Sequence, residues 1–382
     1  MTYAQDHRLD EAKRMDIGAI ADQLHITGLR PWPPRPGVES VGPCPRCGGN
    51  DRFSINGRLG LFNCRRCEGK GDVISLVRWM RDMTLPQALD WLCGPPEEIP
   101  EEERRERARI SDENRKANEA RAKRERDRAI DEARQLWRSA KTADRAGIRP
   151  YLAARGITDA LLPDLPACLR YHPNLPYMVR ADRGWREIHK GPAMLAVVQA
   201  PNGQGIGTHR TWFDPAAPQG KIRIPDPETG APCVRKKLLG SKRGGAIRLH
   251  TPAGPWDTLV MGEGIETTLT ALIAGVWAQA AFWAGVDLGN ISGRRQTGKG
   301  LKYAGLPDLS DRDAFVPPLN VRRLILIEDG DSDPRETRAK LLSGARRAMA
   351  RVPGLTAQIV ACPAGRDLND LLMEDVSDDS QG

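Results

Sequence analysis

Acidic side chains follow each of three apolar, strand-like runs in the C-terminal part of the chain. The runs cover 259–262, 324–327 and 359–362, and the acids after them are Glu263, Asp329, Asp331, Asp367 and Asp370. Open α/β sheets collect ligands at the carboxyl ends of their strands, so these acids are expected to meet at one edge. Clustered carboxylates repel one another unless a hard cation is present, and Mg²⁺ binds carboxylates together with phosphates. The pattern predicts a metal site, with a helix cap as the alternative for Asp367 and Asp370.

Four cysteines form two Cys-x2-Cys pairs, Cys44 with Cys47 and Cys64 with Cys67, with residues 48–63 between the pairs. Two tight knuckles at this spacing can place four thiolates tetrahedrally around Zn²⁺. Because four thiolates leave no open position for water, the zinc ion is expected to be structural rather than catalytic.

Basic residues surround these cysteines and recur in the middle of the chain. Near the cysteines, with Phe53 and Phe62 between them, they would pair with phosphates and stack on the bases of a single-stranded template. In the middle they would neutralise a triphosphate and the template backbone, the alternative being a solvated hairpin. The residues expected to bind nucleic acid or nucleotide are Arg46, Arg52, Arg65, Arg66, Lys70, Arg210, Lys236, Lys237, Lys242 and Arg243.

Composition limits the class of protein. At 382 residues the chain is longer than one ordinary domain, and its net charge of +8 favours a polyanionic partner over a membrane. No apolar run approaches the roughly 18 residues that a membrane-spanning helix needs. Half of the 8 cysteines lie in Cys-x2-Cys pairs and no charged-then-apolar leader precedes them, which favours metal binding in a reducing cytoplasm.

Shifts in composition divide the chain into four predicted parts. Residues 1–94 carry the paired cysteines. Residues 95–141 are rich in charge and contain almost nothing apolar beyond Ala and an occasional Ile, which indicates a solvated helix or a frayed linker. Residues 142–255 mix strands with basic segments in an α+β arrangement. Residues 256–382 alternate strand and helix, which predicts an α/β domain with a mainly parallel sheet.

Hydrophobic periodicity predicts elements within these parts. One helix is expected over 8–26 and two short helices on either side of Thr84-Leu85-Pro86. Asn202-Gly203 predicts a hairpin turn. The last part is expected to contain strands 258–261, 278–283, 323–327 and 357–362, helices 267–274 and 335–351, and a short C-terminal helix.

The cysteine segment resembles a known domain. Cys-Pro-Arg-Cys-Gly-Gly-Asn-Asp-Arg-Phe-Ser at 44–54, followed by Phe-Asn-Cys-Arg-Arg-Cys-Glu-Gly-Lys-Gly-Asp-Val-Ile at 62–74, resembles the zinc-binding domain of phage and plasmid primases. It is similar, more distantly, to that of bacterial replicative primases, in which His usually stands where this chain has Cys47. The resemblance implies a ribbon that helps to choose where on the template synthesis starts.

The acidic pattern resembles the topoisomerase-primase (TOPRIM) domain, which has a Glu after one strand and Asp-x-Asp after a later one. This resemblance implies that Glu263, Asp329 and Asp331 hold catalytic Mg²⁺ or Mn²⁺, and that Asp367 and Asp370 form the acidic segment near the C-terminus, of which one reaches the metal. The Glu-Gly-Ile-Glu-Thr sequence at 263–267 points again to the plasmid and phage group.

Together the two resemblances imply an α/β multidomain DNA primase: a zinc ribbon, a charged helical linker, a mixed α+β subdomain and a TOPRIM domain. It would copy single-stranded DNA into short oligonucleotides from nucleoside triphosphates during replication of a mobile element. The P-loop-like segment 293–300 has Gly300 where that motif needs Ser or Thr, so a separate helicase is expected. The alternatives are a TOPRIM nuclease and a non-catalytic accessory that binds single-stranded DNA.

Overall fold

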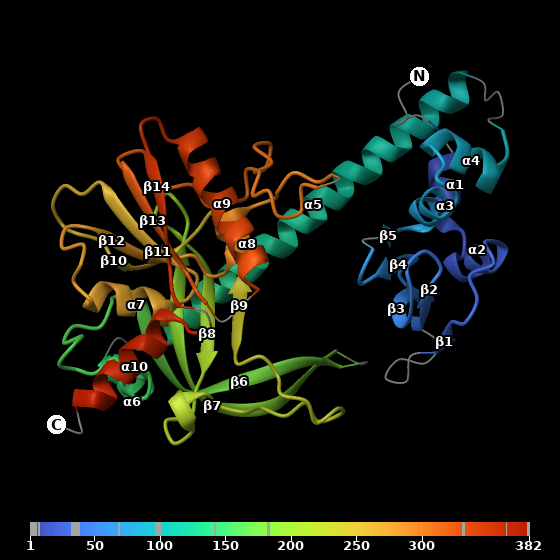
Figure 1. The fold of residues 1–382 in the computed structure, drawn as a ribbon. Coiled ribbons are helices and arrows are strands. Elements are labelled where there is room, and N and C mark those ends of the chain that lie inside the picture. The colour runs from blue at the N-terminus through green and yellow to red at the C-terminus, as the bar shows by residue number, and fades with distance from the viewer. Residues whose placement is uncertain are drawn as a thin grey trace. The chain divides into compact units, whose positions relative to one another are not determined.

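The computed structural model describes residues 6, 8–31, 39–67, 69–95, 101–140, 143–181, 184–298, 300–330, 333–363 and 365–379. The chain divides into two compact units, Met1–Glu119 and Ala120–Gly382, called here the N-terminal and C-terminal units. The division falls inside the helix α5 (Glu101–Ser139), and Figure 1 shows the elements of each unit. Among the described residues, no helix combines the length and the apolar character needed to cross a bilayer.

The N-terminal unit packs helices against a small antiparallel sheet. Its strands pair in the order β1-β2-β3-β4-β5, and Phe53, Ile55 and Leu76 lie in its buried core. Helices α3 and α4 confirm the two short helices predicted on either side of Thr84–Pro86. The elements are α1 (Arg8–Arg14), α2 (Ile17–Gln23), β1 (Arg30–Pro31), β2 (Glu39–Cys44), β3 (Gly48–Asn56), β4 (Leu61–Cys64), β5 (Lys70–Gly71), α3 (Val73–Arg81) and α4 (Leu85–Cys93).

The segment 8–26 forms two helices, α1 and α2, so the prediction of one continuous helix is wrong. Asp16 has an extended backbone, and its carboxylate accepts a hydrogen bond of 2.8 Å from the backbone N–H of Ala19. An aspartate in this position starts a new helix because it satisfies one of the unpaired N–H groups of the first turn. The apolar face predicted for the segment is nevertheless buried, including Ile17 and Leu24.

Helix α5 confirms the helical alternative for the charged segment over 101–139. Oppositely charged side chains four residues apart pair along its exposed surface, among them Arg121 with Glu125 at 3.1 Å and Arg128 with Glu132 at 2.9 Å. Each exposed pair of this kind contributes only about 0.3–0.5 kcal/mol. Near its end the helix joins the C-terminal unit, where Thr208 Oγ1 donates to the carbonyl of Ala133 at 2.7 Å.

The middle of the chain forms a four-stranded antiparallel sheet in the C-terminal unit, in the order β6-β7-β8-β9. The turn between β7 and β8 confirms the predicted hairpin, with Gly203 at a φ of +83° that favours glycine. The elements here are α6 (Arg149–Ala153), β6 (Leu169–Ala181), β7 (Gly184–Gln199), β8 (Gly205–Trp212), the 3₁₀ turn η3 (Pro218–Gly220) and β9 (Lys236–Gly240).

The second sheet of the C-terminal unit has the order β10-β12-β11-β13-β14. Strand β11 pairs in parallel with β12 and β13, β13 pairs in parallel with β14, and β10 pairs antiparallel with β12. The strands and helices predicted after residue 256 are confirmed within a few residues. The elements of this part, of which β10 and α8 were not predicted, are β10 (Ile247–His250), β11 (Thr258–Gly262), α7 (Ile265–Ile273), β12 (Ala281–Ala284), α8 (Leu288–Ser292), β13 (Arg323–Glu328), α9 (Pro334–Arg351), β14 (Thr356–Ala361) and α10 (Leu368–Asp379).

Helices cover both faces of this second sheet (Figure 1). Leu341 and Ala345 of α9 pack on one face, and Ala271 of α7 packs on the other. A further buried cluster joins the two sheets, because Met194 of β7 packs in the same cluster as Ile265 of α7. The ends of the parallel strands are therefore held at a fixed place relative to the antiparallel sheet.

Candidate functional site

The four predicted cysteine ligands meet in the N-terminal unit. Their sulfur atoms all lie within 4.8 Å of one another, and the Sγ atoms of Cys44 and Cys67, and of Cys47 and Cys64, are 3.6 Å apart. Tetrahedral Zn²⁺ with Zn–S bonds of about 2.3 Å separates its sulfurs by about 3.8 Å. Burial opposes ionisation of Cys64, but the backbone amides of Cys67 and Arg66 lower the pKa of its thiol. The residues fit a structural zinc ion.

The aromatic residues of this module are core residues. Phe53 and Phe62 are 0% and 3% exposed, and their ring centroids lie 5.9 Å and 5.4 Å from that of Trp79. The prediction that these two phenylalanines stack on template bases is therefore wrong. Side chains alternate along a strand, so Phe53 faces the same side as buried Ile55, toward helix α3.

The basic residues predicted around the cysteines are mostly at the surface. Arg46 is held by helix α3 and its end, donating to the carbonyl of Trp79 at 2.6 Å and pairing with Asp82 at 3.0 Å. Arg65 lies 3.7 Å from Asp51. The side chains of Arg65, Arg66 and Lys70 are exposed, and that of Arg52 is half-buried.

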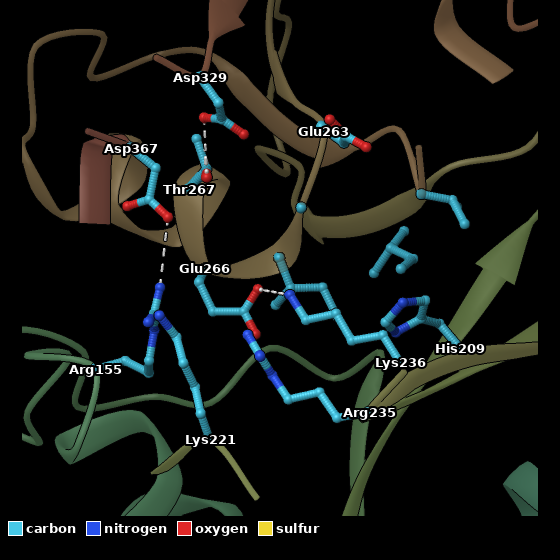
Figure 2. Close-up of a pocket in the computed structure, with 14 residues that line it drawn as sticks. Arg155, His209, Lys221, Arg235, Lys236, Glu263, Glu266, Thr267, Asp329 and Asp367 are labelled. Carbon is cyan, nitrogen blue, oxygen red and sulfur yellow. Dashed lines mark hydrogen bonds and ion pairs between the residues drawn. The ribbon is translucent and has the colours of Figure 1, made fainter. Parts of the chain in front are cut away.

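The C-terminal unit contains a cavity of about 290 Å³ between its two sheets. Carboxylates from the ends of parallel strands line one side, and basic side chains that follow α6 and η3, or lie at and just before the start of β9, line the other (Figure 2). The acids at the strand ends are Glu263, Asp329 and Asp367, Glu266 of α7 also lines the cavity, and the cations are Arg155, Lys221, Arg235 and Lys236.

The second sheet brings three of the predicted acids to this cavity. Glu263 follows β11, Asp329 follows β13, and Asp367 follows β14 and precedes α10. The hydroxyl of Thr267 donates to Asp329 Oδ1 at 3.3 Å. Asp331 lies outside the described residues.

Asp370 is not among the residues that line the cavity. Its carboxylate accepts a hydrogen bond from the backbone N–H of Asp367 at 3.0 Å, and its own N–H donates to Asp367 Oδ1 at 2.7 Å. This reciprocal pair caps helix α10, as the alternative reading of these residues anticipated. Asp367 takes part in the cap and also faces the cavity.

Oxygen donors of this kind suit a hard cation. Within the described ranges, only the four cysteines place three or more ligand atoms within 4.8 Å of one another, so the acids surround the cavity without forming a tight cluster. Mg²⁺ retains several waters and takes one or two protein carboxylates together with phosphate oxygens. The carboxylates of Glu263 and Asp329 fit that mode of binding.

The opposite wall carries excess positive charge. Lys236 pairs with Glu266 at 2.8 Å, and Arg155 lies 3.6 Å from Asp367. Lys221 and Arg235 form no ion pair with any described residue, and the buried Nε of Arg235 has no hydrogen-bond partner there. Burial and the nearby guanidinium groups of Arg155 and Arg235 lower the pKa of Lys221. Such a wall is suited to phosphate oxygens.

Of the five basic residues predicted in the middle of the chain, only Lys236 lines the cavity. Lys237 donates a hydrogen bond to the carbonyl of Met178 at 2.7 Å, and Arg210 packs over the ring of Trp212. Lys237 and Arg210 are cross-strand neighbours, and both lie on the face of the sheet opposite to Lys236. Lys242 pairs with Asp287, and Arg243 pairs with Asp313 at 2.8 Å. The pleat of β9 directs Lys236 and Lys237 to opposite faces, and Lys242 and Arg243 lie beyond the end of that strand.

Buried His209 should make the protein less stable at mildly acidic pH. Burial lowers the pKa of His209 to about 4, against about 6.5 in an unfolded chain. Below pH 6.5 the unfolded chain binds a proton that the folded state cannot, so the stabilisation present above pH 6.5 is lost as the pH falls toward 4. We expect a loss of about 2 kcal/mol between pH 7 and 5, measured by urea unfolding. His209→Gln should reduce this dependence of the unfolding free energy on pH, whereas exposed His250→Gln should not. The same pH dependence in the wild type and both variants would contradict the role given to His209.

Comparisons with known proteins give partial similarities. Residues 127–249 match a family described as a domain of unknown function, DUF7146. No curated protein matches the sequence. Among solved structures, the chain is similar to the zinc-binding and RNA polymerase domains of the Aquifex aeolicus primase, at 15% identity and a TM-score of 0.36, covering 98% of this chain and 84% of that one.

Two further solved structures are also primases. A DNA primase domain from Pseudomonas aeruginosa matches at 13% identity and a TM-score of 0.40, covering 65% of this chain and 75% of that one. The primase fragment of the bacteriophage T7 primase-helicase protein matches at 14% identity and a TM-score of 0.32, covering 89% and 97%. Because these TM-scores are below 0.5, we base the function on the residues of the site.

Proposed function

We propose that this protein is a DNA primase that synthesises short oligonucleotides on single-stranded DNA. The observation that supports this function best is the two-sided cavity, in which carboxylates at the ends of parallel strands face four cations, of which Lys221 and Arg235 have no ion-pair partner among the described residues. Nucleotidyl transfer needs both features, because a metal must be held by acids while the charge of a triphosphate is neutralised.

In the proposed mechanism, Glu263 and Asp329, together with Asp331, hold divalent metal. Bound Mg²⁺ or Mn²⁺ would supply charge neutralisation at the attacking 3′-hydroxyl and at the leaving pyrophosphate. Lys221, Arg235 and Lys236 bind phosphate oxygens of the incoming nucleotide from the opposite wall. The protein's own contribution is therefore positioning and charge, and no side chain has to form a covalent bond.

The zinc module would bind the template in this proposal. Its exposed Arg65, Arg66 and Lys70 lie beside the metal knuckles and can pair with the phosphates of a single strand. The resemblance of 44–54 and 62–74 to phage and plasmid primases supports a role in mobile-element replication beside a separate helicase. The acidic pattern supports assignment of the second sheet to the TOPRIM class.

Purified full-length protein should convert labelled nucleoside triphosphates into short oligonucleotides when single-stranded DNA and Mg²⁺ or Mn²⁺ are present. Product should be absent without template and without metal. Shortening of the template in the absence of nucleotides would instead identify a metal-dependent nuclease. Binding of single-stranded DNA with strong salt dependence but no incorporation would identify a non-catalytic accessory.

A further inference from the structure

Glu266 is a buried acid that the proposed mechanism does not use. It lies in the first turn of α7, three residues after Glu263, and its side chain is only 5% exposed. Its two carboxylate oxygens have different partners: Tyr151 Oη from α6 donates to Oε1, and Lys236 Nζ from β9 donates to Oε2 at 2.8 Å. One carboxylate therefore links three elements of the C-terminal unit that are distant in sequence. Figure 2 shows its pair with Lys236.

The surroundings of Glu266 and Tyr151 favour one protonation state for each side chain. Burial alone would raise the pKa of Glu266, but the Lys236 ammonium and the hydrogen bonds from Lys236 and Tyr151 hold the pKa below its usual value. Burial and the adjacent carboxylate raise the pKa of Tyr151, so the phenol remains a neutral donor. The Glu266 side chain is therefore an anion that accepts one hydrogen bond from a neutral phenol and one from an ammonium.

The position of Lys236 needs such a partner. Its side chain is 35% exposed and lines the cavity beside Arg235, Arg155 and Lys221. Like charges that line one cavity repel one another, and a flexible lysine can turn its ammonium toward water. An anion fixed behind the ammonium offsets that repulsion, and Tyr151 in turn restrains the carboxylate.

We propose that Glu266 is a positioning residue, oriented by Tyr151, that holds the Lys236 ammonium in the cavity for a nucleotide phosphate. This inference rests on the proposed function, since it takes the phosphate to be that of the incoming nucleoside triphosphate. Glu266 itself touches neither the nucleotide nor the metal in this assignment, and its effect passes through Lys236.

The test is a double-mutant cycle on the full-length protein, with ATP and Mg²⁺ as the probe and calorimetry as the binding measurement. Glu266→Gln keeps an oxygen for Tyr151 but removes the charge, and Lys236→Met removes the ammonium. Each should weaken ATP binding about ten-fold, the usual effect of losing a charge-assisted hydrogen bond. In the Lys236→Met background, Glu266→Gln should have no further effect on affinity.

A matched control is Glu336→Gln, which breaks the pair of Glu336 with Arg295 at 2.6 Å outside the cavity and should leave ATP affinity unchanged. If Glu266→Gln weakens binding equally with and without Lys236, the role of Glu266 is structural and the inference is overturned. Should Glu266→Gln fail to fold, judged by circular dichroism, Tyr151→Phe takes its place in the cycle. Its smaller loss of affinity should likewise vanish in the Lys236→Met background, and persistence there would overturn the inference.

The cycle also separates this inference from the proposed function. A protein that binds ATP with a non-additive cycle but makes no oligonucleotide would refute the primase while supporting the positioning role. A protein that makes oligonucleotides with additive single effects would support the primase and refute the positioning role. In an active protein, Glu266→Gln should raise the KM for nucleotide about ten-fold and change kcat much less, because ground-state phosphate binding is what it supports.

Discussion

Replacing Asp329 and Asp331 together with asparagine should abolish oligonucleotide synthesis and leave the protein folded. Asparagine has the shape of aspartate without its charge, so the edge of the sheet keeps its packing while its affinity for divalent metal is lost. Metal ions contribute several kcal/mol of charge stabilisation in such transfers, so synthesis should fall by more than about 1,000-fold. The measurement is incorporation of labelled nucleotide on single-stranded DNA, with the melting temperature recorded beside it.

The matched control for this pair is Asp159→Asn, at an exposed carboxylate that pairs with Arg149 away from the cavity. It should leave synthesis unchanged. Oligonucleotides made at the normal rate by the Asp329/Asp331 variant would show that these acids are not the metal ligands of the reaction. Loss of synthesis accompanied by loss of the folded state would instead require Asp329→Asn alone, because Thr267 can donate to an asparagine oxygen in the same place.

Removing zinc should unfold the module formed by residues 39–93. Its strands are short, and Cys44 and Cys64, at the ends of β2 and β4, belong to the same buried cluster as Phe53 and Leu76. Zinc binding by four such ligands provides about 10–16 kcal/mol, comparable to the whole stability of an ordinary domain. Titration of the full-length protein with a chelator should release one zinc ion per chain and shift the fluorescence of Trp79, whose ring packs against Phe53.

Single substitutions refine this experiment. Cys44→Ser should lower the zinc content and make the other three cysteines of the cluster reactive toward alkylating reagents. Cys93→Ser, at a cysteine of the same unit outside the cluster, should change neither. Full zinc content in the Cys44→Ser protein would contradict the four-thiolate site.

The sequence located the elements and the acids of the site much better than the cations. Periodicity and turn residues are local properties, which is why β11, β13 and α9 lie within a few residues of their predicted bounds. The positions of acids directly after strands are therefore predicted equally well, since parallel strands end at a common edge of the sheet. Glu263 and Asp329 reach the cavity for this reason.

Arg155 and Tyr151 were not predicted as site residues because no local pattern marks them. Arg155, just after α6, lines the cavity, and Tyr151, within α6, reaches Glu266, because the antiparallel sheet packs against α7 through Met194 and Ile265. Such packing is a property of the assembled core. By contrast, the burial of Phe53 could have been read from its alternation with Ile55 along one strand.

Lys236 and Lys237 are chemically identical neighbours, and the pleat of β9 gives them different surroundings. One faces Glu266 and the other lies over the ring of Tyr177, 3.7 Å from its centroid. A one-residue slip of β9 would exchange them without altering composition or charge. For any homologous chain, the informative feature is therefore the spacing to the glycine that ends the strand. A lysine four residues before that glycine faces the cavity, as Lys236 does, and one three residues before it, like Lys237, does not.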